Sequence, residues 1–215
     1  MKYIALFDLD GVIIDTEGQY TLVWNRIGEK YGKEKDFGIL IKGQTFDKIL
    51  KEHFHSEAQS KEIIQLLNEF ETERRYDYVP GAVEFVDSLR EIGVRCAVVT
   101  SSNRLKMEKV YRHHPDLREK FDYILTSEDF TQSKPSPECY LTGMRMLGAD
   151  AAHTVIFEDS VSGLTAARES GARVVGLTTT NPEEVVREYA DIVINDFTGC
   201  VFEDFLKNPE NVSAY

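Results

Sequence analysis

Short apolar runs recur along this chain, and segments with helical periodicity separate them. In chain order, the runs are 4–7, 95–99, 123–125, 154–157, 173–177 and a weaker one at 192–194. Such runs are typical of strands that are buried on both faces of a parallel sheet. The intervening helical patterns lie at 82–92, 104–112, 137–147 and 162–170. This alternation predicts an α/β fold with a doubly wound, Rossmann-like parallel sheet and helices on both of its faces.

Residues 17–78 interrupt the alternation. They contain no convincing strand, but aromatic and aliphatic side chains recur there at helical spacing in three stretches. We therefore expect an inserted α-helical cap domain at 17–78, with 1–16 and 79–215 forming the Rossmann-like core. A chain of 215 residues is long enough for one domain with such an insertion.

The composition is that of an ordinary soluble protein, with 42% hydrophobic and 29% charged residues. Acidic residues outnumber basic ones by 37 to 25, and no run of lysine and arginine offers a binding surface for nucleic acid or an anionic membrane. The cysteines, Cys96, Cys139 and Cys200, are widely spaced and form no Cys-x-x-Cys pair, so we expect free thiols. We expect no signal peptide, and the sequence contains no apolar run of membrane-spanning length. We expect a cytoplasmic protein that is a monomer or a weak dimer.

Polar residues follow four of the expected strands. Because ligands of such sheets bind beyond the carboxyl ends of the strands, these residues are candidates for a common site. In chain order they are Asp8, Asp10, Thr100, Ser101, Ser102, Lys134, Glu158 and Asp159. Each group alone is compatible with a turn or a helix cap. Their convergence at one edge of one sheet favours a catalytic site.

The charges of this site point to a metal ion. Four carboxylates would meet a single lysine, Lys134, and would repel one another and any bound anion. A hard divalent cation with oxygen ligands, Mg²⁺ before Ca²⁺, removes this repulsion. We expect Asp8 and Asp159 to bind it through their side chains, Asp10 through its backbone carbonyl, and Glu158 directly or through water.

These motifs resemble those of the haloacid dehalogenase-like phosphatases. The similarity keeps the family's order and spacing over nearly the whole chain, and it consists of Asp8-Leu9-Asp10-Gly11-Val12, Thr100, Lys134-Pro135 and Glu158-Asp159. Within the family, the sequence is most similar to the beta-phosphoglucomutase-like branch, which has a small helical cap.

The resemblance implies a Mg²⁺-dependent phosphatase that hydrolyses a small phosphorylated metabolite, with a sugar phosphate as the expected substrate. Asp8 would attack phosphorus and form an aspartyl-phosphate, and Asp10 would protonate the leaving oxygen and then activate water. Lys134 and Mg²⁺ would offset the charge of the phosphoryl oxygens, while Thr100 and nearby backbone N–H groups would hold them.

Two cap positions depart from the beta-phosphoglucomutase pattern. Tyr20 stands where those enzymes carry a histidine, and Phe46 stands where they carry an arginine that grips a second phosphate. A sugar bisphosphate would be held poorly without that arginine, so hydrolysis is favoured over phosphoryl transfer between sugar hydroxyls. Besides Ser101 and Ser102, the candidate substrate-binding residues are Tyr20, Trp24, Lys42, Gln44 and Thr45. For Trp24, a place in the core of the cap is the more frequent alternative.

Two other functions stay open on the sequence alone. A phosphohexomutase of the beta-phosphoglucomutase type would share the four motifs. A receiver-like phospho-acceptor signalling module also combines paired acids, an acceptor aspartate, a Ser/Thr and a Lys-Pro on a doubly wound sheet. The order of the elements and the long insertion speak against the receiver.

Overall fold

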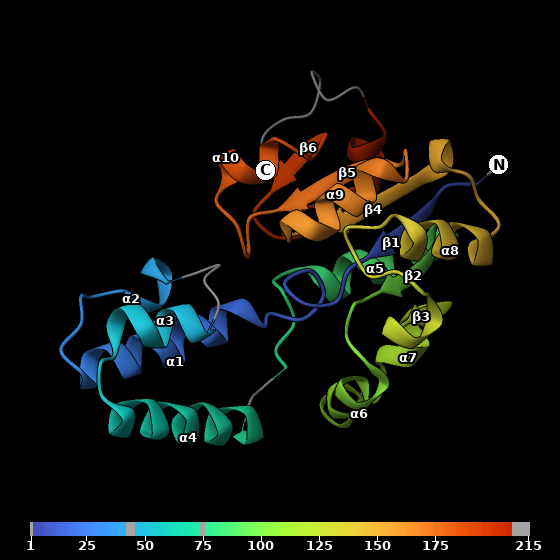
Figure 1. Ribbon diagram of the computed structural model, residues 1–215. Helices are drawn as coiled ribbons and strands as arrows, with labels where there is room; N and C mark the ends of the chain where they lie inside the picture. The colour runs from blue at the N-terminus through green and yellow to red at the C-terminus, as the bar shows by residue number, and fades with distance from the viewer. Residues whose placement is uncertain (1, 42–45, 74–75, 208–215) are drawn as a thin grey trace. The chain divides into compact units, whose positions relative to one another are not determined.

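The computed structural model describes residues 2–41, 46–73 and 76–207. The chain divides into two compact units, Met1–Asp15 with Tyr76–Tyr215, and Thr16–Arg75. We call the first the core unit and the second the helical unit; Figure 1 shows the elements of both.

The core unit is built on a six-stranded sheet with the strand order β3-β2-β1-β4-β5-β6. Its strands are β1 (Ile4–Phe7), β2 (Arg95–Val99), β3 (Tyr123–Leu125), β4 (Thr154–Glu158), β5 (Arg173–Leu177) and β6 (Ile192–Ile194). Every neighbouring pair is parallel. The predicted doubly wound α/β fold is therefore confirmed. Strand β1 lies between β2 and β4, so its carboxyl end borders the ends of both.

Helices cover both faces of this sheet (Figure 1). One face packs against α5 (Ala82–Glu91) and α6 (Arg104–His113), and the other packs against α8 (Glu138–Leu147), α9 (Val161–Glu169) and α10 (Glu183–Arg187). Side chains of β1 alternate between the two faces: Ala5 and Phe7 join the first hydrophobic cluster, and Ile4 and Leu6 join the second. Shorter helical elements complete the unit, namely α7 (Leu117–Lys120), η1 (Ser127–Asp129), η2 (Ala151–His153) and η3 (Phe202–Leu206).

Aromatic packing fixes the ends of the two central strands. The ring of Phe7 stacks on that of Phe157 with centroids 4.7 Å apart, and Phe85 meets both rings edge-on. All three side chains are buried, at most 3% exposed. Because the chain continues from Phe7 and Phe157 directly into Asp8 and Glu158, this packing also fixes where those carboxylates begin.

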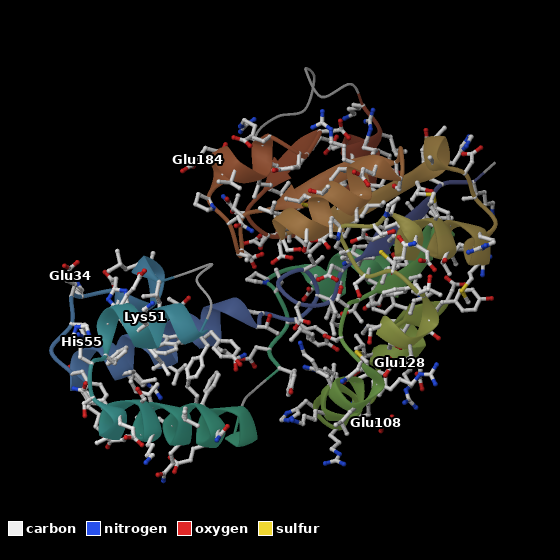
Figure 2. The ribbon with its side chains drawn as sticks, viewed as in Figure 1. Glu34, Lys51, His55, Glu108, Glu128 and Glu184 are labelled. Carbon is white, nitrogen blue, oxygen red and sulfur yellow. The ribbon has the colours of Figure 1, made fainter. Side chains whose placement is uncertain are left out.

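The helical unit has a hydrophobic core of its own. The unit consists of α1 (Glu17–Lys30), α2 (Phe37–Leu40), α3 (Phe46–His53) and α4 (Glu57–Glu73). Helix α2 was not predicted, because a single turn is too short to show a period. Polar side chains such as Glu34, Lys51 and His55 are exposed on this unit (Figure 2). Within the described residues of both units, no helix is long and apolar enough to span a membrane.

The two chain segments that lead to the helical unit pair with each other inside the core unit. The backbone N–H of Asp15 donates to the carbonyl of Asp77 at 2.8 Å, and that of Val79 donates to the carbonyl of Ile13 at 3.0 Å. Between these bonds, Ile14 and Tyr78 form an antiparallel bridge. The departing and returning segments are thus closed into a short ribbon.

Candidate active site

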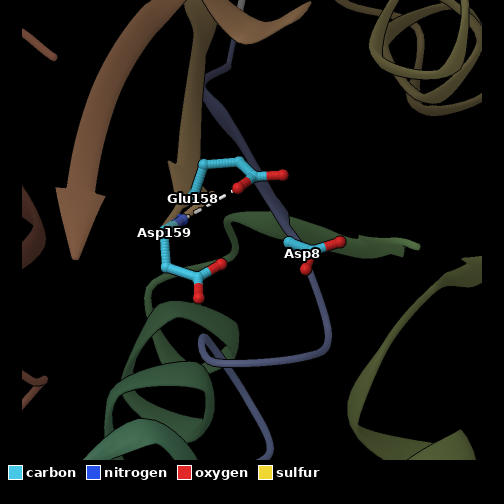
Figure 3. A group of neighbouring side chains, drawn as sticks. All are labelled: Asp8, Glu158 and Asp159. Carbon is cyan, nitrogen blue, oxygen red and sulfur yellow. Dashed lines mark hydrogen bonds between the residues drawn. The ribbon is translucent and has the colours of Figure 1, made fainter. Parts of the chain in front are cut away.

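Three carboxylates and one ammonium group converge at the carboxyl ends of the central strands. Asp8 follows β1, Glu158 ends β4, Asp159 comes next, and Lys134 lies between η1 and α8. All are buried: Asp8 is 7% exposed, Asp159 2% and Glu158 0%, and the side chain of Lys134 is 4% exposed. Oxygens of the three carboxylates lie within 4.8 Å of one another, and Figure 3 shows them together. The structure therefore brings together four of the residues predicted from the strand ends.

Lys134 links two of these carboxylates. Its Nζ donates to Asp8 Oδ1 at 2.6 Å, to Glu158 Oε1 at 2.7 Å and to the backbone carbonyl of Val99 at 3.1 Å. Burial lowers the pKa of Lys134, but the charges of Asp8 and Glu158 raise it by more, so it ends above its ordinary value. The lysine is thus charged, and it holds one oxygen of Asp8 in a fixed position.

Glu158 has both carboxylate oxygens occupied. Oε1 accepts from Lys134 and, at 2.9 Å, from the hydroxyl of Tyr140. Oε2 accepts from the backbone N–H of Asp159 at 2.8 Å, which Figure 3 shows, and from the N–H and hydroxyl of Ser160 at 3.0 and 3.1 Å. Five donors saturate the acceptor capacity of a carboxylate. Of the two metal-binding modes predicted for Glu158, the one through water is therefore favoured.

The loop after β5 holds Asp159. The hydroxyl of Thr180 donates to its Oδ2, the hydroxyl oxygen of Thr179 lies 3.4 Å from the same atom, and the side-chain amide of Asn181 donates to its backbone carbonyl at 2.8 Å. The Thr179 hydroxyl donates its proton to the carbonyl of Gly11 at 2.6 Å, which connects this loop to the one after β1. None of these loop residues was predicted from the sequence. They follow β5 closely, as the predicted site residues follow the other strands, so their place in the chain was the signal for them.

The cluster suits a hard divalent cation. Burial, together with the charges of Glu158 and Asp10, raises the pKa of Asp8 from 3.8 to about 7 although Lys134 lowers it. Burial and the same kind of repulsion, from Glu158 and Asp8, raise the pKa of Asp159. Three buried carboxylates against one ammonium leave an excess of negative charge and offer only oxygen ligands, which is the donor set of Mg²⁺ or Ca²⁺. The residues present can therefore hold a metal ion.

Asp10 lies beside the cluster and has partners of its own. Its Oδ2 accepts from the hydroxyl of Ser102 at 2.8 Å and from Lys106 Nζ at 2.6 Å. Lys106 was not predicted, and it corrects the charge count: the four carboxylates face two lysines rather than one. It was missed because it lies in the first turn of α6 and not at a strand end.

Thr100 and the two serines after it occupy the loop between β2 and α6. Thr100 is 1% exposed, its N–H donates to the carbonyl of Leu125 at 2.9 Å, and its hydroxyl oxygen accepts from the N–H of Ser102 at 3.0 Å. Ser101 is exposed. The loop is thus folded back on itself, and Ser102 is the member that reaches Asp10.

A sequence profile of the haloacid dehalogenase-like hydrolases matches residues 5–177. The chain belongs to this family. The match runs from β1 to β5 and so includes the buried carboxylates and Lys134. A receiver-like signalling module, one of the alternatives left open by the sequence, is not what the chain is.

Two phosphatases and a mutase are similar to this haloacid dehalogenase-like hydrolase. It is 31% identical over 206 residues to validoxylamine A 7'-phosphate phosphatase of Streptomyces hygroscopicus subsp. limoneus, with 92% of this chain and 95% of the relative covered. It is 31% identical over 184 residues to the phosphorylated carbohydrates phosphatase of Thermotoga maritima, with 80% and 84% covered. The crystal structure of beta-phosphoglucomutase from Clostridium difficile matches with a TM-score of 0.65, 22% identity and 98% of both chains covered. The last likeness shows a shared fold.

The cap candidates of this hydrolase belong to the helical unit. The ring of Tyr20 lies 5.3 Å from that of Phe70, and Trp24 is 7% exposed among the aromatic rings of the unit's own core. The ring of Phe46 lies 6.3 Å from that of Trp24. Trp24 thus occupies the core position that was the alternative to substrate binding. The three remaining candidates lie outside the described residues; they are Lys42, Gln44 and Thr45.

Proposed function

We propose that this haloacid dehalogenase-like hydrolase is a Mg²⁺-dependent phosphatase that hydrolyses a small phosphorylated metabolite, with a sugar phosphate as the favoured substrate. The observation that carries the proposal is the environment of Asp8: one of its oxygens is held by Lys134 at 2.6 Å, within a buried cluster of carboxylates that suits a cation. The relatives named as phosphatases of a 7'-phosphate and of phosphorylated carbohydrates support the substrate class.

The reaction proceeds in two steps at Asp8. A carboxylate oxygen of Asp8 attacks phosphorus, the bond from phosphorus to the ester oxygen breaks, and the electron pair moves to that oxygen, which takes a proton from Asp10. Water then attacks the aspartyl-phosphate and gives its proton to Asp10. The bond between phosphorus and Asp8 breaks, inorganic phosphate leaves, and both aspartates return to their starting states.

Three groups of the core unit serve the phosphoryl oxygens. Lys134 offsets their charge, and Thr100 with neighbouring backbone N–H groups binds them. Asp8 and Asp159 would hold Mg²⁺ through their side chains, and Asp10 through its backbone carbonyl; Glu158 would act through water. When bound, the cation offsets negative charge on the phosphoryl group.

We further propose that residues 17–78 form the cap that selects the substrate. Tyr20, Lys42, Gln44 and Thr45 are the candidate contacts, and Tyr20 in place of histidine favours hydrolysis over mutase activity. The expected partner is a small phosphate ester, without nucleic acid or a membrane. We expect a monomer or weak dimer, and a cytoplasmic location fits the three cysteines, all of which are free.

Phosphate release tests this proposal. Purified protein with Mg²⁺ is assayed against sugar phosphates, nucleotides and pyrophosphate, and we expect turnover of sugar phosphates that EDTA abolishes. Asp8→Asn removes the nucleophile and should abolish it too, whereas Asp87→Asn, at the ion pair of α5 with Lys120, should leave it intact. Unchanged activity in Asp8→Asn would contradict the mechanism. Faster isomerisation than hydrolysis of a β-hexose 1-phosphate, with a bisphosphate activator, would instead identify a mutase.

A further inference from the structure

The two carboxylate oxygens of Asp10 have different surroundings. Oδ2 accepts two hydrogen bonds, from Ser102 Oγ at 2.8 Å and Lys106 Nζ at 2.6 Å, whereas Oδ1 is buried and has no hydrogen-bond partner among the described residues. One oxygen is thus fixed to the loop and helix that follow β2, and the other is left for a different purpose.

We propose that Lys106 is a positioning residue for Asp10, and that with Ser102 it reserves Oδ1 as the oxygen that exchanges the proton with the substrate. This inference rests on the proposed phosphatase function. Lys106 does not touch the substrate; it acts through the orientation of Asp10.

The arrangement suits both protonation states of Asp10. When Asp10 carries the proton on Oδ1, Oδ2 is the carbonyl oxygen of the acid and still accepts from Lys106 and Ser102. After the proton has passed to the leaving oxygen, Oδ2 is one oxygen of a carboxylate and accepts the same two bonds. The side chain therefore keeps one rotamer through both steps of the reaction and does not have to reorient between them.

The pair differs from an ordinary surface ion pair that joins α6 to α7. The side chains of Lys106 and Asp10 are 31% and 29% exposed, whereas those of Arg118 and Glu108 are 60% and 59% exposed. A second donor, Ser102, shares the oxygen, and both donors lie more than ninety positions from Asp10 in the chain. Solvent therefore competes less for this pair, and its geometry is set by the packing of the core unit.

Leaving-group dependence tests the proposal. Lys106→Met and Ser102→Ala are compared with Lys109→Met, a matched change at an exposed lysine of α6. An alkoxide needs a proton to leave, whereas p-nitrophenolate does not. For a sugar phosphate, whose leaving group is an alkoxide, we expect Lys106→Met and Ser102→Ala to lower kcat/KM by about tenfold or more. For p-nitrophenyl phosphate we expect them to lower it by less than about threefold. Lys109→Met should match the wild type with both esters.

A second arm asks whether Lys106 acts through Asp10. In an Asp10→Ala background, Lys106→Met should change kcat/KM by less than about twofold, because the group that it positions is gone. The thermal shift produced by Mg²⁺ should be the same in Lys106→Met as in the wild type, since Lys106 contacts the side chain of Asp10 and not the carboxylate cluster.

The results that would overturn this inference differ from those that would refute the proposed function. An equal loss for both esters in Lys106→Met overturns the inference, as does a further large loss in the Asp10→Ala background, which would mean direct contact of Lys106 with the substrate. In both cases the wild type is an active phosphatase and the proposed function stands. Wild-type protein that releases no phosphate from either ester refutes the proposed function, and the inference with it.

Discussion

The hydroxyl of Tyr140 offers a sharp test of how the carboxylate cluster is held together. Tyr140 and Glu158 are both 0% exposed, and the hydroxyl donates to Glu158 Oε1 at 2.9 Å. Burial, followed by the charges of Glu158 and Asp8, raises the pKa of Tyr140 well above its ordinary value, so it remains a neutral donor. Tyr140→Phe removes this one donor and keeps the ring, whose centroid lies 4.9 Å from Lys134 Nζ.

The expected cost follows from these contacts. A hydrogen bond to a charged group contributes about 1.5–3 kcal/mol to stability, and the buried Glu158 Oε1, which keeps Lys134 as a donor, has no water to replace the lost hydroxyl. Because the ring keeps its packing, no cavity is added to this figure. We therefore expect Tyr140→Phe to lower the free energy of unfolding by about 1.5–3 kcal/mol.

The chain contains a matched control. The hydroxyl of Tyr78 is buried and has no hydrogen-bond partner among the described residues. Tyr78→Phe removes an unsatisfied polar group, so the same substitution should be neutral or stabilising there. Urea unfolding with EDTA present, followed by circular dichroism, compares the two variants with the wild type at equal m values. A Tyr140→Phe variant within about 0.5 kcal/mol of the wild type, or an equal loss in both variants, refutes the reasoning.

Three further outcomes are expected around the metal site. Thr180→Val removes a donor to Asp159 and should weaken Mg²⁺ binding about tenfold or more, measured by titrating activity with Mg²⁺. Gly11→Ala should do the same and also destabilise the fold, measured by thermal unfolding, because Gly11 has a φ of +73° and a Cβ there would meet the Asp159 carboxylate. Without metal, folding raises the pKa of Asp8 from 3.8 to about 7, so the folded state binds a proton that the unfolded chain has released, and stability falls as the pH rises through this window. Because Mg²⁺ binds the ionised carboxylate, its thermal stabilisation should be larger at about pH 8 than at about pH 5, and equal shifts would contradict this.

The strands and the acidic cluster could be predicted because their physical causes are local in the sequence. Burial on both faces requires a nearly continuous apolar run, as in Ile4–Phe7, and the parallel arrangement then carries the following residue to the common edge. Asp8, Glu158 and Asp159 were found in this way.

The residues that support the cluster could not be found by the same reasoning. Lys106 and Tyr140 reach the site from the first turns of α6 and α8, where a lysine or a tyrosine has ordinary solvated or core roles. Their contacts depend on how α6 and α8 pack against the sheet. Helix α10, with five residues, was missed for another reason, since it is too short to show a period.

The short ribbon formed by Ile13–Asp15 and Asp77–Val79 bears on how enzymes of this build can diversify. Because the residues on either side of Thr16–Arg75 are hydrogen-bonded to each other, this segment is an insertion whose two ends are held together in the core unit. The sheet therefore tolerates a segment of any length at this position. Doubling the length of such a loop costs only about 0.6 kcal/mol in closure entropy. Segments of different size and shape can therefore be exchanged at this junction with little effect on the stability of the sheet. With substrate selection in the helical unit, as proposed above, substrate choice and phosphoryl chemistry would be encoded in parts of the chain that can change independently of each other.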